Sequence, residues 1–270
     1  MEILLKVNNL NVEYTGKRIV QALRDVSFDV RQGEIVGIIG ESGGGKTTLA
    51  YSIINLLPGN TRINGDIELK GKNILSFNEK ELRSLRGREI GIIPQDPAAA
   101  FNPVFTIGYQ FEEFLKSKGF FFGKEERVLF MEELLRKVHL FYPQRILKSY
   151  PHQLSGGQLQ RAMIALTIAV KPSLLIADEP TSSLDVTVES QLMHMFLNLR
   201  KELGLTIIFI THNLGLIEVL CDRVVVLYRG QVKEVGDKTS VIFSPQDGYT
   251  KSLRDSFKAI EEVENGFVES

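Results

Sequence analysis

Residues 40–47, with the sequence GESGGGKT, are the strongest indication of the fold of this chain. They follow the apolar run EIVGII and precede TTLAYSIINLL, in which apolar residues recur with helical spacing. A glycine-rich turn between a buried strand and a helix points backbone N–H groups at an anion, and this one fits the phosphate-loop pattern G-x-x-x-x-G-K-[ST]. A chance glycine-rich turn would not have the strand, the helix, the lysine and the hydroxyl all in register. The segment therefore predicts a nucleotide-binding α/β core.

The expected chemistry of this loop is phosphate binding. Its consecutive glycines let the backbone wrap around phosphate groups, the Lys46 ammonium reaches the β- and γ-phosphates, and the Thr47 hydroxyl is available to Mg²⁺. ATP and Mg²⁺ are therefore the expected cofactors. The residues expected to bind ATP are Gly40, Glu41, Ser42, Gly43, Gly44, Gly45, Lys46, Thr47 and Thr48.

Composition argues against several other classes of protein. The chain has 270 residues, of which 43% are hydrophobic, so it can bury a substantial core. Its net charge of −1 gives no basis for a nucleic-acid partner. The single cysteine, Cys221, excludes an internal disulfide and is expected to be a small buried residue. The N-terminus does not read as a signal peptide, and no apolar run approaches the ~20 residues of a membrane span, so we expect a soluble cytosolic protein.

The apolar pattern changes along the chain. Residues 1–35 are expected to alternate short β-type runs, ILLKV, LNVEY, IVQAL and VSFDV, with turns, whereas helical spacing dominates from about residue 96 to residue 170. After residue 170, strands and helices alternate again. The strands there are continuously apolar, which is typical of a parallel sheet covered on both faces. We predict an α/β phosphate-loop core with an N-terminal antiparallel β subdomain and an inserted α-helical subdomain. The expected boundaries are 1–95 and 171–238 for the core, 96–170 for the helical subdomain and 239–270 for a polar tail.

Two carboxylates end the apolar run SLLIAD and begin the loop that follows it. Asp178 is placed to hold Mg²⁺, directly or through water, and Glu179 is placed as the general base for a water that attacks the γ-phosphate. On their own these would be ordinary acidic residues at the end of a strand. A phosphate loop in the same chain favours the catalytic interpretation.

Three further residues are candidates on weaker evidence. His212 ends another apolar strand, and strand ends at the edge of the phosphate loop face the nucleotide, so it can hydrogen-bond to the γ-phosphate. Gln95 is a loop residue whose amide can reach a metal or a water. Tyr14 ends a strand, where an aromatic side chain is more often part of the core than stacked on adenine. The expected catalytic residues are Glu179, His212 and Gln95, and the expected metal ligands are Thr47, Gln95 and Asp178.

The order of these pieces, together with LSGGQ at residues 154–158, resembles the nucleotide-binding subunits of ATP-binding cassette (ABC) transporters. The resemblance covers roughly residues 3–237, and a phosphate loop, this signature and DEP form a highly specific combination. It implies the ABC type of phosphate-loop core. It also implies that Tyr14 stacks on adenine, that Gln95 opens the loop sensing a transmembrane partner, and that His212 is the switch histidine. A loop touching the opposite subunit is implied at Ser183, Leu184 and Asp185.

The same resemblance gives the signature a role in a dimer. Two cassettes of this family pair head to tail, and each nucleotide lies between the phosphate loop of one chain and the signature of the other. Ser155 and Gly157 would donate to the γ-phosphate of the partner's ATP, at a helix N-terminus suited to it. Ser155 can also cap this helix, and we expect it to do both. The signature residues are Leu154, Ser155, Gly156, Gly157 and Gln158.

The stretch PQDPAAAFNPVFTIGYQ is similar to the peptide/nickel group of bacterial ABC importers, which implies that residues 95–112 form a groove for a short permease helix. SPQDGYTKSL resembles the P-x-H-P-Y-T tail of that group, with Asp247 and Gly248 where His-Pro is common. No cysteine cluster is found near the C-terminus. Its absence favours the shorter subunits that serve the uptake of nickel, metal chelates or small peptides.

Together these features predict an ATPase subunit of a bacterial ABC importer, which couples ATP hydrolysis at a head-to-tail cassette dimer to uptake of peptides or of nickel and other metal chelates. The implied partners are a second, different cassette subunit, two transmembrane permease subunits and, indirectly, an extracytoplasmic solute-binding protein. The chain would work at the cytoplasmic face of the cell membrane, held there by the permeases. The alternatives are an exporter cassette and a soluble ABC ATPase acting on nucleic acid or ribosomes.

Overall fold

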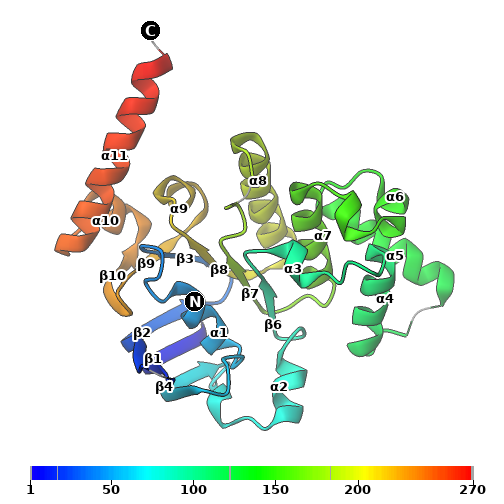
Figure 1. The fold of residues 1–270 in the computed structure, drawn as a ribbon, viewed down its shortest axis with the longest axis horizontal. Helices are drawn as coiled ribbons and strands as arrows, with labels where there is room; N and C mark the ends of the chain where they lie inside the picture. The colour runs from blue at the N-terminus through cyan, green and yellow to red at the C-terminus, as the bar shows by residue number, and fades with distance from the viewer. Residues whose placement is uncertain (1, 17, 122, 183, 269–270) are drawn as a thin grey trace. The chain divides into compact units, whose positions relative to one another are not determined.

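The computed structural model describes residues 2–16, 18–121, 123–182 and 184–268, with side-chain surroundings as far as Lys258 (Figure 1). By their contacts these residues divide into two compact units. The first unit comprises residues 1–78 and 208–270, and the second unit comprises residues 79–207. The subdomain boundaries near residues 95, 170 and 238 stay a prediction.

An antiparallel sheet in the first unit has the strand order β2-β1-β4-β5. The strand β1 pairs antiparallel with β2 on one side and with β4 on the other. Val26, Phe28 and Val30 on β2 are buried and Ser27 is exposed, an alternation typical of a sheet with one face on a core. The predicted N-terminal antiparallel region is confirmed. Its strands are β1 (Ile3–Tyr14), β2 (Val20–Arg31), β4 (Thr61–Leu69) and β5 (Lys72–Asn73).

Two of these strands are longer than the sequence pattern suggests. The runs ILLKV and LNVEY both belong to β1, and IVQAL and VSFDV both fall on β2 apart from Ile19. Between the runs, Asn9 (φ 45°) and Asp25 (φ 50°) have left-handed backbone, and the register of β1 against β2 shifts there. A bulge bends a strand without ending it. The polar residues between the apolar runs therefore mark bulges, not turns.

A second sheet carries the phosphate loop. In it β10, β9, β3 and β8 are neighbours in that order, and β3 pairs in parallel with β9. Every residue of β3 and β8 is buried, as predicted for strands covered on both faces. A Cβ at Gly37 would stand 2.4 Å from Ile217 Cδ1 and 2.8 Å from Cys221 Sγ, so glycine lets the helix α9 pack directly on β3. These elements are β3 (Ile35–Ile39), β8 (Thr206–Thr211), α9 (Leu214–Leu220), β9 (Arg223–Tyr228) and β10 (Gln231–Asp237).

The first unit also contains the helix that follows the phosphate loop and the helices of the tail. The tail predicted to be polar is helical over most of its length, and α11 extends far along it (Figure 1). These elements are α1 (Lys46–Ile53), the 3₁₀ turn η1 (Ile74–Ser76), α10 (Lys238–Phe243) and α11 (Gly248–Val268).

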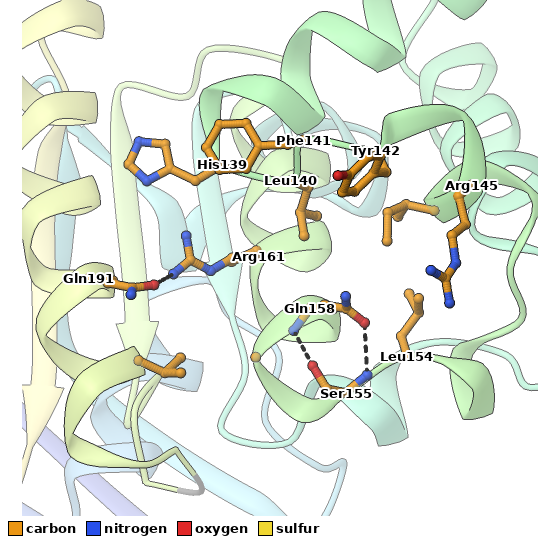
Figure 2. Close-up of a pocket in the computed structure, with 13 residues that line it drawn as sticks. His139, Leu140, Phe141, Tyr142, Arg145, Leu154, Ser155, Gln158, Arg161 and Gln191 are labelled. Atoms are coloured by element: carbon orange, nitrogen blue, oxygen red, sulfur yellow. Dashed lines mark hydrogen bonds between the residues drawn. The ribbon is translucent and has the colours of Figure 1, made fainter.

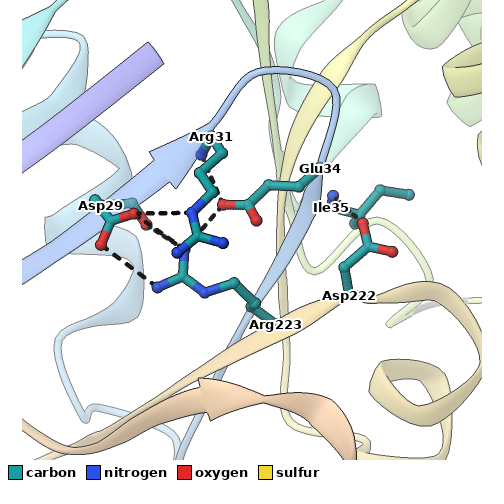
Figure 3. A network of polar contacts seen from close by, with 6 residues as sticks. All are labelled: Asp29, Arg31, Glu34, Ile35, Asp222 and Arg223. Atoms are coloured by element: carbon teal, nitrogen blue, oxygen red, sulfur yellow. Dashed lines mark hydrogen bonds and ion pairs between the residues drawn. The ribbon is translucent and has the colours of Figure 1, made fainter. Parts of the chain in front are cut away.

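A network of polar contacts joins the turn between β2 and β3 to the start of β9 (Figure 3). Arg223 donates through Nη1 to Asp29 Oδ2 and to Glu34 Oε1, each at 3.1 Å. Glu34 is 4% exposed, and Asp222 accepts from the backbone N–H of Ile35 at 2.8 Å. Buried carboxylates require such partners. The network therefore fixes the strand that leads into the phosphate loop.

The second unit is mainly helical. Its strand β6 (Ile90–Ile93) pairs in parallel with β7 (Leu174–Asp178). Buried residues repeat every four positions along α4, which packs its apolar stripe inward. None of the helices in the described part of the chain combines the length and the apolar character needed to cross a membrane. The helices are α2 (Glu79–Leu85), α3 (Pro97–Ala100), α4 (Ile107–Ser117), α5 (Lys124–Lys137), α6 (Pro143–Lys148), η2 (Pro151–Gln153), α7 (Gly156–Ile168) and α8 (Val186–Leu203).

Candidate active site

The phosphate loop runs from the end of β3 to the start of α1, as the sequence predicts. Two of its glycines are required by their surroundings. A Cβ at Gly40 would stand 1.9 Å from the carbonyl oxygen of Leu227. Gly45 has φ 102°, and a Cβ there would stand 2.8 Å from the carbonyl oxygen of Ala22. Side chains could be accommodated at neither position. The loop therefore lies directly on the neighbouring backbone.

Lys46 lies inside this loop. The residue is 5% exposed, and its Nζ donates to the carbonyl oxygens of Gly40 at 2.8 Å and Glu41 at 2.9 Å. The Glu41 carbonyl also accepts from the N–H of Gly44 at 3.0 Å. A buried ammonium enclosed by a glycine-rich loop at a helix N-terminus matches the charge of a triphosphate. The residues present thus fit the predicted nucleotide.

Tyr14 lies close to the helix that follows the loop. Its hydroxyl is 3.2 Å from Thr48 Oγ1, and the ring is half-buried at the end of β1. The contact brings two of the predicted ATP-binding residues together. Stacking of Tyr14 on adenine stays a prediction.

Gln95, Asp178 and Glu179 all lie in the second unit. Because β6 and β7 are parallel with Ile93 opposite Ala177, the loops that follow both strands leave the same edge. There the amide Nε2 of Gln95 donates to Glu179 Oε2 at 3.2 Å. Asp178, next to Glu179, is 2% exposed. The predicted base and the predicted loop residue are therefore in direct contact.

The backbone of Glu179 is unusual. Its φ is 45°, in the left-handed region that residues with a side chain rarely adopt. Strained backbone of this kind is concentrated at functional sites, where the surrounding structure maintains it. Asn9, Asp25 and five other non-glycine residues of the described chain also have positive φ, so it is the contact with Gln95 that distinguishes Glu179.

His212 follows β8 directly and is exposed. The strands β8 and β3 are neighbours in the sheet, so His212 and the phosphate loop follow adjacent strands, and both lie in the first unit. Gln95, Asp178, Glu179 and the signature belong to the second unit.

The signature forms a capped helix N-terminus (Figure 2). Ser155 Oγ accepts from the N–H of Gln158 at 3.3 Å, while the Gln158 side chain accepts from the N–H of Ser155 at 3.1 Å. This reciprocal pair satisfies two donors that the helix leaves unpaired. The expected capping role of Ser155 is confirmed.

The glycines of the signature differ in their surroundings. A Cβ at Gly156 would meet no atom of the residues that the structure describes within 4 Å, whereas one at Gly157 would stand 3.1 Å from Val188 Cγ1 on α8. The fold of the described chain therefore does not require glycine at position 156. Nothing in the described residues therefore explains a glycine at this position.

The predicted dimer loop precedes α8. Asp185 caps that helix, with Oδ1 accepting from the N–H of Val188 at 2.9 Å, and Leu184 is half-buried. Ser183 lies outside the described residues. Contact of this loop with another subunit stays a prediction.

A pocket of about 470 Å³, which the sequence did not predict, lies beside the signature (Figure 2). Ser155 and Gln158 line it together with Tyr142, which is 77% exposed. Arg161 also lines the pocket and donates to the Val138 carbonyl oxygen at 3.1 Å and to Gln191 Oε1 at 2.8 Å. Burial lowers the pKa of the Arg161 guanidinium. These hydrogen bonds of the buried Arg161 hold the signature helix against its neighbours. The sequence could have indicated this role, because Arg161 follows shortly after the signature in LSGGQLQR.

A family model described as ABC transporter matches residues 23–182. The chain is 41% identical over 260 residues to a probable peptide ABC transporter ATP-binding protein of Sinorhizobium fredii, covering 94% of this chain and 77% of that protein. It is also 41% identical over 256 residues to the dipeptide transport ATP-binding protein DppD of Bacillus subtilis, covering 94% of this chain and 76% of that protein.

Solved structures agree with these sequence matches. The fold superimposes with a TM-score of 0.78 and 28% identity on the ATP-binding cassette MJ0796 in a dimeric post-hydrolysis state bound to ADP and Pi, covering 87% of this chain and 99% of that one. It superimposes with a TM-score of 0.74 and 28% identity on cbiO1 of Clostridium perfringens, part of an ABC transporter complex, covering 90% and 92%.

Proposed function

This chain belongs to the ABC transporter family and is an ABC ATPase, and we propose that it drives a bacterial importer of peptides or of nickel and other metal chelates. The single observation that supports import most strongly is the similarity, over 93% of the chain, to proteins named putative peptide import ATP-binding proteins. That similarity favours peptides over nickel. The exporter and nucleic-acid alternatives are not favoured by it.

The phosphate loop would hold the triphosphate. Its backbone N–H groups and the Lys46 ammonium neutralise the phosphates, and Tyr14 provides a surface for adenine. Thr47, Gln95 and Asp178 supply the oxygen ligands that Mg²⁺ prefers. When bound, Mg-ATP supplies the phosphoryl group that is transferred to water. The enclosed position of Lys46 supports the assignment of the phosphate loop.

Glu179 would act as the general base in hydrolysis. Its carboxylate accepts the proton of the attacking water, and the hydrogen bond from Gln95 orients that carboxylate. His212 donates a hydrogen bond toward the γ-phosphate. Because Gln95 also begins the loop expected to sense a permease, the same contact would connect hydrolysis to the membrane subunits.

The signature would act on the nucleotide of a second cassette, a different chain that pairs head to tail with this one. The open surroundings of Gly156 and the dimeric state of the related MJ0796 cassette support this arrangement. Leu154, Ser155, Gly156, Gly157 and Gln158 would contact the partner's ATP, and Leu184 and Asp185 the partner chain.

Two permease subunits would hold the chain at the cytoplasmic face of the membrane. A solute-binding protein on the other side of the membrane would deliver the solute to these permeases. An exposed apolar surface supports a permease contact in the 95–112 region. Val104 is 67% exposed, and the rings of Phe105 and Tyr109 stack at 4.6 Å between centroids. Exposed apolar clusters of this kind commonly mark protein contacts.

Purification of the tagged full chain from detergent-solubilised membranes tests the assignment. Mass spectrometry should identify two permeases and a second cassette, and vesicles containing this complex should take up a labelled dipeptide when ATP is supplied. Copurification with ribosomes or DNA in place of permeases would contradict it. Uptake of nickel without dipeptide would replace the favoured cargo.

A further inference from the structure

The tail segment SPQDGYTKSL has no role in the chemistry described so far, yet one of its side chains reaches the phosphate loop. Tyr249 is the second residue of α11. Its Oη accepts a hydrogen bond from the backbone N–H of Glu41 at 3.2 Å, although the two residues are 208 positions apart. Glu41 is the second residue of the loop.

The Glu41 residue is held on both sides. Its N–H donates to Tyr249, while its carbonyl oxygen accepts from Lys46 Nζ at 2.9 Å and from the N–H of Gly44 at 3.0 Å. The phenol therefore fixes the same residue that holds the ammonium in the loop.

Tyr249 is itself held in place by ring stacking. Its ring stacks on Tyr228 with 4.0 Å between centroids and 23° between planes. Tyr228 ends β9, directly after Leu227, whose carbonyl oxygen lies against Gly40 of the loop. The stack thus rests on the strand that also supports the loop.

Polar contacts fix the start of α11. Asp247 Oδ1 accepts from the N–H of Tyr249 at 2.8 Å, and the Glu234 carboxylate accepts from the N–H groups of Gln246 at 2.9 Å and Asp247 at 3.2 Å. Burial, with a smaller contribution from the charge of Glu41, raises the pKa of the Tyr249 phenol. The hydroxyl is therefore neutral at pH 7 and keeps an oxygen lone pair for the Glu41 N–H.

We propose that Tyr249 is a positioning residue for ATP binding, which holds the Glu41 peptide so that the phosphate loop keeps its binding shape before the nucleotide arrives. The inference rests on the proposed function of that loop. It makes the first turn of α11 part of the nucleotide site, although the turn lies far from the loop in sequence. Pre-organisation of a loop raises affinity because less ordering remains to be done on binding.

The variant Tyr249→Phe tests this directly, because it keeps the stacked ring and removes the hydroxyl. Two properties of the full chain are measured: amide hydrogen exchange of the loop without nucleotide, and the Kd for Mg-ATP by calorimetry. We expect exchange at Glu41 to be roughly 3- to 10-fold faster and Mg-ATP binding to be weaker by about the same factor, the usual effect of one lost hydrogen bond. Tyr249→Ala should give a larger change because the stack is lost as well.

Tyr51→Phe is the matched control, since the Tyr51 hydroxyl has no hydrogen bond within the described part of the chain and lies on the helix after the loop. It should leave both measurements unchanged. If Tyr249→Phe exchanges and binds like the wild type, the positioning role is overturned, while the proposed function stands as long as Lys46→Ala abolishes binding. If wild type and Lys46→Ala bind Mg-ATP equally, the proposed function fails, and the exchange measurement still decides whether Tyr249 orders the loop.

Discussion

The side-chain amide of Gln95 donates to the Glu179 carboxylate across 3.2 Å, which joins the loop after β6 to the residue after β7. The parallel pairing of the two strands produces this contact, because Ile93 lies opposite Ala177 and each side chain follows two residues later.

Gln95→Ala should slow hydrolysis roughly 3- to 10-fold through the loss of this hydrogen bond. The Kd for ATP measured in EDTA should not change, because Gln95 is not part of the phosphate loop that would carry the affinity. Gln144→Ala, at an exposed glutamine on α6, is the control and should hydrolyse ATP at the normal rate. Equal rates for both variants would remove Gln95 from the role of orienting Glu179.

The variant Gly156→Ala tests whether glycine at this position is needed for folding or for contact with a partner's nucleotide. The added methyl group meets no atom of the described residues within 4 Å, and Gly156 does not have a positive φ, so alanine adds no strain and stabilises by ~0.4–1 kcal/mol through the lower entropy of the unfolded chain. Thermal denaturation should therefore show equal or higher stability. ATP turnover of the assembled transporter should fall at least ~10-fold, because the methyl group would stand where the partner's nucleotide binds. Normal turnover would show that this position does not face a nucleotide.

Arg223→Met should destabilise the chain by about 3–5 kcal/mol, because Glu34 is left buried without its charged partner. The matched change Arg254→Met removes an exposed pair with Asp255 and should alter stability by less than ~1 kcal/mol. Urea denaturation of the two variants measures the difference. Equal stabilities would mean that the network does not fix β3.

The sequence predicted local structure correctly where residue type and spacing along the chain determine it. GESGGGKT specified the strand, loop and helix around Lys46, and Ser155 specified a capped helix N-terminus, although the Gln158 half of that cap was not predicted. The bulges at Asn9 and Asp25 were missed, since a polar residue between apolar runs is compatible with either a turn or a bulge. Pairing across the sheet decided between them.

Contacts between distant segments could not be predicted. Tyr249 meets Glu41 because the β9–β10 hairpin and α11 return the tail to the loop, and no local pattern encodes that path. The left-handed backbone of Glu179 was missed for a related reason. Surrounding structure imposes it against the preference of the residue itself.

The central claim is that Glu179 activates the water that cleaves ATP, and its most direct test is the fate of labelled ATP bound to the purified transporter. With Glu179→Gln in this chain, the complex should bind ATP normally and retain it intact, with hydrolysis at this site slowed by ~10²–10⁴. The wild-type complex should release ADP under the same conditions. Conversion of all bound ATP to ADP by the variant, within a factor of about two of the wild-type rate, would contradict the claim.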